Sequence, residues 1–179
     1  ALLIVSTLPT MLIGYQCKRL IVRTAASHMF SGIGLLLTGV ILLVVDYSNI
    51  NGNKGTREAD YGDAMWMGIC QGISVFPGIS RLGLTMSAGL FCGMSRKFAV
   101  KYSLLMSIPA VIGAFFVEMG EFTSVSMTVG RGFTYILGML VAGIVGYLVI
   151  RYLVNQLKLR YFAFYCFAAG IIVLAANYI

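Results

Sequence analysis

Charged residues are scarce in this chain of 179 residues, of which Asp, Glu, Lys and Arg together make up only 11%. Soluble globular domains carry about 25% of such residues, so the composition excludes an ordinary soluble protein. Hydrophobic residues make up 59%, and the mean hydropathy is +0.91. The longest polar stretch, 47–62, has only 16 residues, so no soluble domain is inserted. We therefore expect residues 1–179 to form a single all-α membrane domain, built as a helical bundle.

Acidic residues, histidine and paired cysteines are also few. Six acidic residues stand against 13 basic ones, which gives a net charge of +7. The basic residues lie in short clusters between apolar runs, which is typical of membrane topology signals rather than of nucleic-acid binding. None of the four cysteines belongs to a CxxC pair, which argues against a metal or disulfide framework. The only histidine, His28, begins an apolar run beside a basic segment, so we expect it at the membrane interface.

The apolar runs predict five membrane spans and one pair of shorter helices. The shorter runs, 63–76 and 84–94, have 14 and 11 residues. A helix needs about 20 residues to cross a membrane, so each of these is half a span. The expected spans are 1–15, which is truncated or kinked at Pro9, then 25–45, 102–117, 132–150 and 161–179.

A break joins the two short runs. Pro77 lacks a backbone donor and disfavours a helical conformation in the residue before it, and Gly78 permits a sharp turn. A break at membrane depth is tolerated only where it is buried in protein or lines a watery cavity. We therefore interpret 63–94 as a re-entrant helix-loop-helix hairpin with Ser80 and Arg81 at its tip.

The distribution of Lys and Arg bears on the course of this hairpin. If it enters and leaves on one side, the loops near residues 54, 96 and 151 share that side with eight basic residues, against four in the other loops. The richer side is then cytoplasmic. The alternative is one broken span that crosses the membrane, which divides the same residues nine to three. Charge alone leaves both open, and the short legs with polar or basic flanks favour the hairpin.

Arg81 is the centre of the candidate site. An arginine at membrane depth costs roughly 2.5 to 3.5 kcal/mol to insert, so it normally faces a cavity and a partner. Its planar guanidinium can grip two phosphate oxygens at once. Ser80 can cap the helix that starts near Leu82, whose positive end points at the same anion, and Gly78 and Thr85 complete the candidate diphosphate site. The alternative is that Arg81 only satisfies carbonyls at the helix break and that Ser80 is only a cap.

Three further patterns have more than one interpretation. Gln71 either hydrogen-bonds across the hairpin or lines its cavity. Glu118 and Glu121 form a carboxylate pair that could hold a metal in isolation, but they end a span, so interfacial solvation is favoured. The glycine pairs 68/72 and 89/93, each four residues apart, permit close helix packing, although 21 glycines in the chain also explain them.

Several short motifs occur together on and after the hairpin. They are Gln71-Gly72, Pro77-Gly78-Ile79-Ser80-Arg81, Gly83, Thr85, Gly93-Met94-Ser95-Arg96, Tyr102-Ser103-Leu104-Leu105 and Ile108-Pro109-Ala110. This set resembles the second signature region of the undecaprenyl-diphosphate phosphatases of the bacitracin-resistance type. The resemblance is strong over 63–114, covers the C-terminal two-thirds of the chain, and extends loosely over the whole chain because the flanking spans agree in order and spacing. The resemblance implies an inverted repeat in which each half is a re-entrant hairpin followed by three spans. Residues 1–46 would then be the last two spans of the first repeat, and 63–179 the second repeat.

The resemblance also implies a function. It implies a multi-pass enzyme of the plasma (inner) membrane that hydrolyses undecaprenyl diphosphate to undecaprenyl phosphate and orthophosphate, which recycles the lipid carrier for cell-wall synthesis. The resemblance further implies a divalent cation, Mg²⁺ or Ca²⁺, as cofactor. It also implies that the site faces outward and that the C-terminus lies outside, and a homodimer is a candidate assembly. Arg81 and Ser80 would be catalytic, and Gly78, Thr85 and Gln71 would help to bind the diphosphate.

The chain also departs from the family pattern. The family's first signature, an ExxxE pair with nearby serines and a histidine, is absent from it, so we expect no metal ligands in this chain. Leu82 stands where the motif has a second serine, and Lys97 where an acidic residue is common. The chain begins with Ala1 inside an apolar run, so we expect a fragment that is inactive alone. A polyprenyl-phosphate transporter or flippase, which also builds sites from paired hairpins, is the alternative function, and non-catalytic binding is a third.

Overall fold

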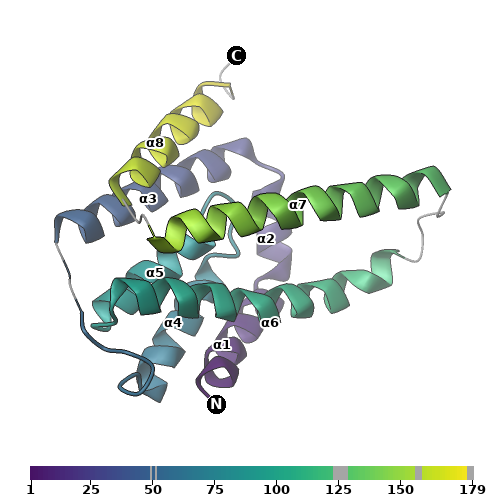
Figure 1. Ribbon diagram of the computed structural model, residues 1–179. Coiled ribbons are helices and arrows are strands. Elements are labelled where there is room, and N and C mark those ends of the chain that lie inside the picture. The colour runs from purple at the N-terminus through teal and green to yellow at the C-terminus, as the bar shows by residue number, and fades with distance from the viewer. Residues whose placement is uncertain (49, 51, 123–128, 156–158, 177–179) are drawn as a thin grey trace. The chain divides into compact units, whose positions relative to one another are not determined.

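The computed structural model describes residues 1–48, 50, 52–122, 129–155 and 159–176, with the side chains of 117–131 and 152–158 left outside the description. Most of the described residues are helical, and the described residues contain no strand, only an isolated β-bridge between Lys54 and Met94. The all-α prediction is therefore confirmed. In chain order the helices are α1 (Leu2–Gln16), α2 (Lys18–Ala25), α3 (His28–Tyr47), α4 (Tyr61–Ile73), α5 (Arg81–Phe91), α6 (Arg96–Phe122), α7 (Val129–Asn155) and α8 (Leu159–Ala176) (Figure 1).

Four of these helices are long and apolar enough to cross a membrane. The candidate spans are His28–Tyr47, Arg96–Phe116, Gly132–Arg151 and Leu159–Ala176. They correspond to the four full-length spans that the sequence predicts. The apolar α1 is shorter, with 15 residues and Pro9 inside it, as expected for a truncated or kinked span. The protein is thus an all-α, multi-pass membrane protein.

The chain divides into two compact units. The first unit consists of Ala1–Ala110 and Lys158–Ile179, and the second of Val111–Leu157. The second unit contains the end of α6 and all of α7, whose described side chains are predominantly apolar on every face of the helix. A helix that is apolar all round is typical of a membrane span rather than of a helix at the surface of a soluble protein.

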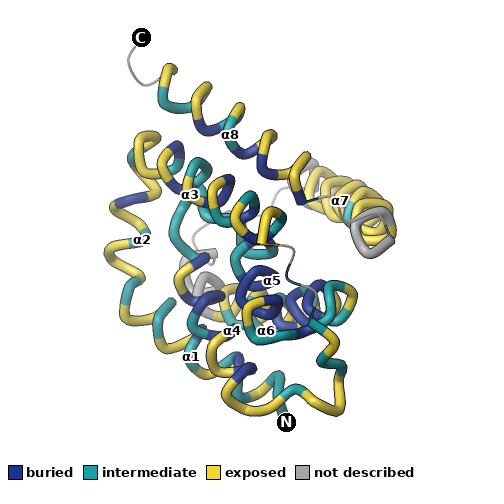
Figure 2. The backbone as a smooth tube through the Cα atoms, turned by 90° about the vertical axis from the view of Figure 1, so that its left-hand side faces the viewer, coloured by how far each residue is buried: buried dark blue, intermediate teal, exposed yellow. Residues whose placement is uncertain are grey.

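In the first unit the helices pack in the order α1, α4, α5, α3, α8, since each contacts the next. The hairpin of α4 and α5 therefore lies between α1 and α3. Figure 2 shows buried turns on both of its helices, and seven of the 11 residues of α5 are buried. The hairpin is thus part of the core of this unit, as a polar break inside a membrane protein must be.

Close approach of α1 and α4 depends on a glycine. A Cβ at Gly68 would lie 2.2 Å from the carbonyl oxygen of Ser6, so no other residue fits there without a backbone shift. The hydroxyl of Thr10 donates a hydrogen bond to the Gly68 carbonyl at 2.8 Å. At Gly72, one turn later, a Cβ would lie 2.7 Å from the side chain of Ile13. The 68/72 pair is therefore a packing surface, as its spacing indicated, and its partner is α1.

Two segments differ from what the sequence predicted. The basic segment after α1, expected as a loop, forms the short helix α2 because it contains neither Gly nor Pro, and it buries Thr24. The basic cluster before the expected span at 102 belongs to α6, which begins at Arg96. In both places the polarity of Lys and Arg suggested a loop, but their long side chains are good helix formers and their charged ends remain in water.

Candidate functional site

The turn between α4 and α5, residues 74–80, forms the tip of the hairpin. Gly78 has a φ of +84°, in the region that side chains disfavour, so the predicted sharp turn at Pro77-Gly78 is confirmed. A Cβ at Gly78 would also lie 2.1 Å from the carbonyl oxygen of Ser31 on α3. The tip is therefore pressed against a neighbouring helix, which fixes where α5 begins.

Ser80 caps α5. Its backbone is extended, its Oγ accepts a hydrogen bond from Gly83 N at 3.2 Å, and its carbonyl oxygen accepts one from Leu84 N at 2.9 Å. The predicted cap is thus confirmed, with the helix starting at Arg81, one residue earlier than expected. Among the described residues nothing accepts a hydrogen bond from the backbone N–H of Arg81 or Leu82. The positive end of α5 therefore presents two open donors.

Arg81 is the first residue of α5 and its side chain is partly exposed. Within the described part of the chain, its guanidinium makes neither an ion pair nor a hydrogen bond. The alternative interpretation, in which Arg81 only satisfies carbonyls at the helix break, requires a hydrogen bond from the guanidinium to a carbonyl oxygen, and the described residues supply none. Five N–H donors on a permanent cation are thus left for a group that these residues do not contribute.

Thr85 lies one turn after Arg81 and is fully buried. Its hydroxyl donates to the Arg81 carbonyl oxygen at 2.7 Å and forms a second hydrogen bond with the hydroxyl of Ser103 on α6. Both capacities of the Thr85 hydroxyl are therefore used inside the protein. The structure brings Thr85 next to the backbone of Arg81, where it braces the first turn of α5 against α6.

Gln71 is buried on α4, and the hydrogen bond of its side chain goes to α6 and not to the other helix of the hairpin. Its Nε2 donates a hydrogen bond to the carbonyl oxygen of Met106 at 3.0 Å. Its Oε1 is also buried and receives no hydrogen bond from the described residues. Gln71 therefore joins α4 to α6 and leaves one buried acceptor open.

Thr38 on α3 contacts the tip, and the sequence analysis did not predict this contact. Its Oγ1 accepts a hydrogen bond from the backbone N–H of Ser80 at 3.0 Å. Ser31, Gly34 and Thr38 follow one another at helical spacing on α3, and all three contact the tip. This stripe of small residues was a usable signal, but the first half of the chain carried no recognised motif.

Two acidic residues lie at the base of the hairpin, the end opposite the tip. Asp60 and Asp63 form a capping box at the start of α4, and Lys54 Nζ lies 3.2 Å from Asp63 Oδ2. The hydrogen bond with Asp63 raises the pKa of Lys54 above its ordinary value of 10.5. The backbone of Lys54 also pairs with that of Met94, after the end of α5. The charges of Lys54 and Asp63 therefore compensate each other at this end of the hairpin. We call the group formed by Lys54, Asp60, Asp63 and Met94 the clasp.

The described residues do not fit a divalent cation. They contain no group of three His, Cys, Asp or Glu side chains. The carboxylate of Asp63 is paired with Lys54, and that of Asp46 with Arg160 at 3.9 Å. His28 is exposed at the start of α3. The side chains of Glu118 and Glu121 lie outside the described residues.

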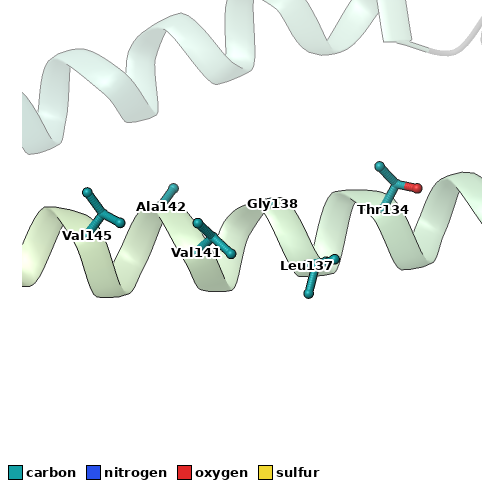
Figure 3. A pocket seen from close by; sticks show the side chains of 6 residues that line it. All are labelled: Thr134, Leu137, Gly138, Val141, Ala142 and Val145. Carbon is teal, nitrogen blue, oxygen red and sulfur yellow. The ribbon is translucent and has the colours of Figure 1, made fainter.

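A shallow hollow on α7 is of a different kind. Six residues line it, and none of them is charged (Figure 3). A phosphate needs positive charge around it, and none of these side chains carries one, so this surface is not a candidate phosphate site. The lining residues are Thr134, Leu137, Gly138, Val141, Ala142 and Val145.

Comparison with known proteins gives a consistent set of relatives. Residues 1–172 match the family described as bacitracin resistance protein BacA, so the resemblance is confirmed and extends beyond the C-terminal two-thirds. An undecaprenyl-diphosphatase of Desulforapulum autotrophicum is 37% identical over 184 residues, which cover 100% of this chain and 65% of that protein. One from Methanosphaera stadtmanae is 37% identical over 174 residues, covering 96% and 62%. One from Methanococcus maripaludis is 37% identical over 172 residues, covering 96% and 67%. The chain therefore spans 62–67% of the length of these curated relatives.

Proposed function

This chain belongs to the bacitracin resistance protein BacA family, and from that membership we propose that it supplies the arginine-bearing half of a membrane enzyme that hydrolyses undecaprenyl diphosphate to undecaprenyl phosphate and orthophosphate. The observation that carries the proposal is the guanidinium of Arg81, which stands at the N-terminus of α5 without a partner among the described residues. The relatives are named undecaprenyl-diphosphatases, so the lipid diphosphate is the anion that this group would meet.

The tip offers donors of three kinds to a diphosphate. The Arg81 guanidinium supplies a planar pair of N–H donors, and the backbone N–H groups of Arg81 and Leu82 point out of the helix end. The Oγ of Ser80 accepts from Gly83 N, so its own proton stays available to a phosphate oxygen. Gly78 lets the backbone come close, while Thr85 and Gln71 act from behind the tip, through their bonds to Arg81 and α6.

Hydrolysis breaks the bond between the terminal phosphorus and the bridging oxygen, and forms a bond from that phosphorus to a water oxygen. The bridging oxygen leaves with the lipid monophosphate, the terminal phosphorus leaves as orthophosphate, and the water proton is released. Negative charge builds up on the bridging oxygen as its bond breaks. Donors already held at that position stabilise this charge without reorganisation, and we assign that role to Arg81 with Ser80.

We assign proton transfer from water, and the binding of Mg²⁺ or Ca²⁺, to residues outside this chain. Relatives are longer than this chain. Of its described carboxylates, those of Asp63 and Asp46 pair with Lys54 and Arg160, and those of Asp60 and Glu58 accept hydrogen bonds from backbone N–H groups. A divalent cation supplies further positive charge to the phosphates when it is bound. The transporter or flippase alternative gains no support, because neither the family description nor the names of the relatives point to it.

We further propose an orientation in the inner membrane. Lys54 and Met94 pair at the base of the hairpin, so the residues before α4 and after α5 lie at the same end. This supports a re-entrant course with the base at the cytoplasmic face, where the basic Lys97 and Lys101 follow. The tip then reaches a cavity that opens outward, and the C-terminus lies outside. A homodimer stays part of the proposal.

Replacement of Arg81 by Lys in the complete protein tests this function. Lysine keeps the charge but loses the planar fork, so release of phosphate from undecaprenyl diphosphate should fall roughly a hundred- to a thousandfold, about 2.7 to 4 kcal/mol. The thermal midpoint in detergent should stay unchanged, because the guanidinium of Arg81 bonds to no described residue. Leu82→Ser, at the neighbouring position, is the control and should be neutral or mildly activating. Near-normal turnover of Arg81→Lys would reject the proposal, and equal losses of melting temperature and turnover would favour a structural arginine.

A further inference from the structure

Thr38 lies on α3, outside the hairpin and outside every motif that points to the proposed site. It is 1% exposed, and its hydroxyl contacts both its own helix and the tip. The hydroxyl donates its proton to the Gly34 carbonyl oxygen at 2.9 Å, and the Gly78 carbonyl oxygen of the tip is a second, longer acceptor at 3.4 Å. A lone pair is thereby directed at the backbone N–H of Ser80, which donates to it at 3.0 Å.

This bond reaches the candidate site in one step. Ser80 is the cap of α5: its Oγ and its carbonyl oxygen hold Gly83 N and Leu84 N. The residue that follows, Arg81, carries the guanidinium. Thr38 thus bonds to Ser80, the residue whose side chain and carbonyl oxygen accept hydrogen bonds from the first turn of α5. A valine at position 38 has nearly the same shape but leaves the Ser80 N–H without this acceptor.

We propose that Thr38 is a positioning residue for the hydrolytic site, which acts through the backbone of Ser80 to hold Arg81 in its productive place. The proposal rests on the function proposed above for the tip. Thr38 is buried and both capacities of its hydroxyl are used, so it has no group left for substrate. Its effect must therefore pass through the position of the tip.

Thr38→Val and Thr38→Ser in the complete protein separate this role from a general loss of packing. Serine keeps the hydroxyl and loses a methyl group, whereas valine keeps the bulk and loses the hydroxyl. The matched control is Thr10→Val, because Thr10 is also buried and its hydroxyl also links two helices, through the Gly68 carbonyl. Thr10 bonds to α4 and not to the tip.

The first measurement is amide hydrogen exchange with peptides that isolate Ser80, which does not depend on any activity. Thr38→Val should speed exchange at the Ser80 amide roughly tenfold, while Thr38→Ser and Thr10→Val leave it at the wild-type rate. Unchanged exchange in Thr38→Val overturns the proposal, whether or not the protein is a phosphatase.

The second measurement is turnover of undecaprenyl diphosphate at saturating and limiting substrate. A displacement of about 1 Å at a reacting centre costs on the order of a hundredfold, so kcat of Thr38→Val should fall between about ten- and a hundredfold. Thr38→Ser should retain most of the wild-type kcat, and Thr10→Val should lose stability without this loss of kcat. Faster exchange at Ser80 with wild-type kcat would refute the positioning role. A wild-type protein without hydrolysis would instead refute the proposed function, while hydrogen exchange still decides whether Thr38 holds the tip.

Discussion

Gly34→Ala is the substitution for which the structure gives the most direct estimate. A Cβ on Gly34 would lie 2.6 Å from the carbonyl oxygen of Pro77 and 3.0 Å or less from backbone atoms of Gly78, whereas ordinary contacts begin at 3.4 Å. The tip or α3 must therefore withdraw by about 0.8 Å, and the atoms in the way are backbone, which cannot rotate aside. Overpacking of this kind typically costs about 1–3 kcal/mol. A displacement of nearly 1 Å at the tip should also lower turnover on the order of a hundredfold.

Gly39→Ala on the same helix provides the control. Its Cβ would lie 3.1 Å from the ring of Phe167, a side chain that can move, and it receives the same gain in helix propensity. The assay measures thermal midpoint in detergent and phosphate release from undecaprenyl diphosphate for both variants of the complete protein. Gly34→Ala should lose both, and Gly39→Ala should stay close to wild type. The reasoning fails if Gly34→Ala turns over substrate within about twofold of Gly39→Ala, because the tip would then tolerate the displacement.

Three further predictions concern topology, the clasp at the base and the isolated chain. With the four native cysteines replaced, Arg57→Cys and Lys97→Cys should react with an impermeant thiol reagent from the cytoplasmic side and Arg23→Cys from the other side; labelling of 57 and 97 from opposite faces would contradict a re-entrant hairpin. Because its pKa is raised in the folded state, Lys54 contributes stability that is complete below its ordinary pKa of 10.5 and is lost as the pH rises through the raised value. The difference in thermal midpoint between wild type and Lys54→Met should thus be constant from neutral pH to the ordinary pKa and shrink above it, and a difference that grows there would exclude the ion pair as its cause. The 179-residue chain by itself should release no phosphate from undecaprenyl diphosphate with Mg²⁺ or Ca²⁺, since its described residues contain no group of three metal-ligating side chains, and measurable turnover would show that ligands from outside this chain are not needed.

The break in the hairpin and its cap were predictable because both depend on local chemistry. Proline and glycine determine their own backbone, and a serine before a helix accepts from that helix's first turn wherever it is placed. Pro77, Gly78 and Ser80 therefore behave in the structure as their identities indicate. The long spans were equally readable, since about 20 consecutive apolar residues have few alternatives to a membrane helix.

The partners of the tip were not predictable in the same way. Thr38 lies 42 positions before Ser80, and Ser103 lies 18 positions after Thr85. A threonine in an apolar helix is as often an isolated residue bonded to the backbone of its own helix, as Thr7 is in α1. Thr38 bonds to Ser80 only because α3 packs against α5, and this packing is not visible in the sequence. Gln71 shows the same limit, because its partner on α6 was not among the alternatives that its sequence position suggested.

The N-termini of the two hairpin helices carry side-chain charges of opposite sign. α4 begins with Asp60 and Asp63, negative charges that the positive end of a helix favours. α5 has no acidic residue in its first turn and begins with Arg81, whose charge has the sign that this end disfavours by about 0.3–1 kcal/mol. Within the described residues no carboxylate compensates it, whereas the lysine at the base is paired. A bound anion would meet both the guanidinium and the helix end, so the arrangement that costs stability in the free protein is the one that favours a diphosphate at the tip. This asymmetry supports a ligand, rather than a packing role, as the reason for an arginine at position 81.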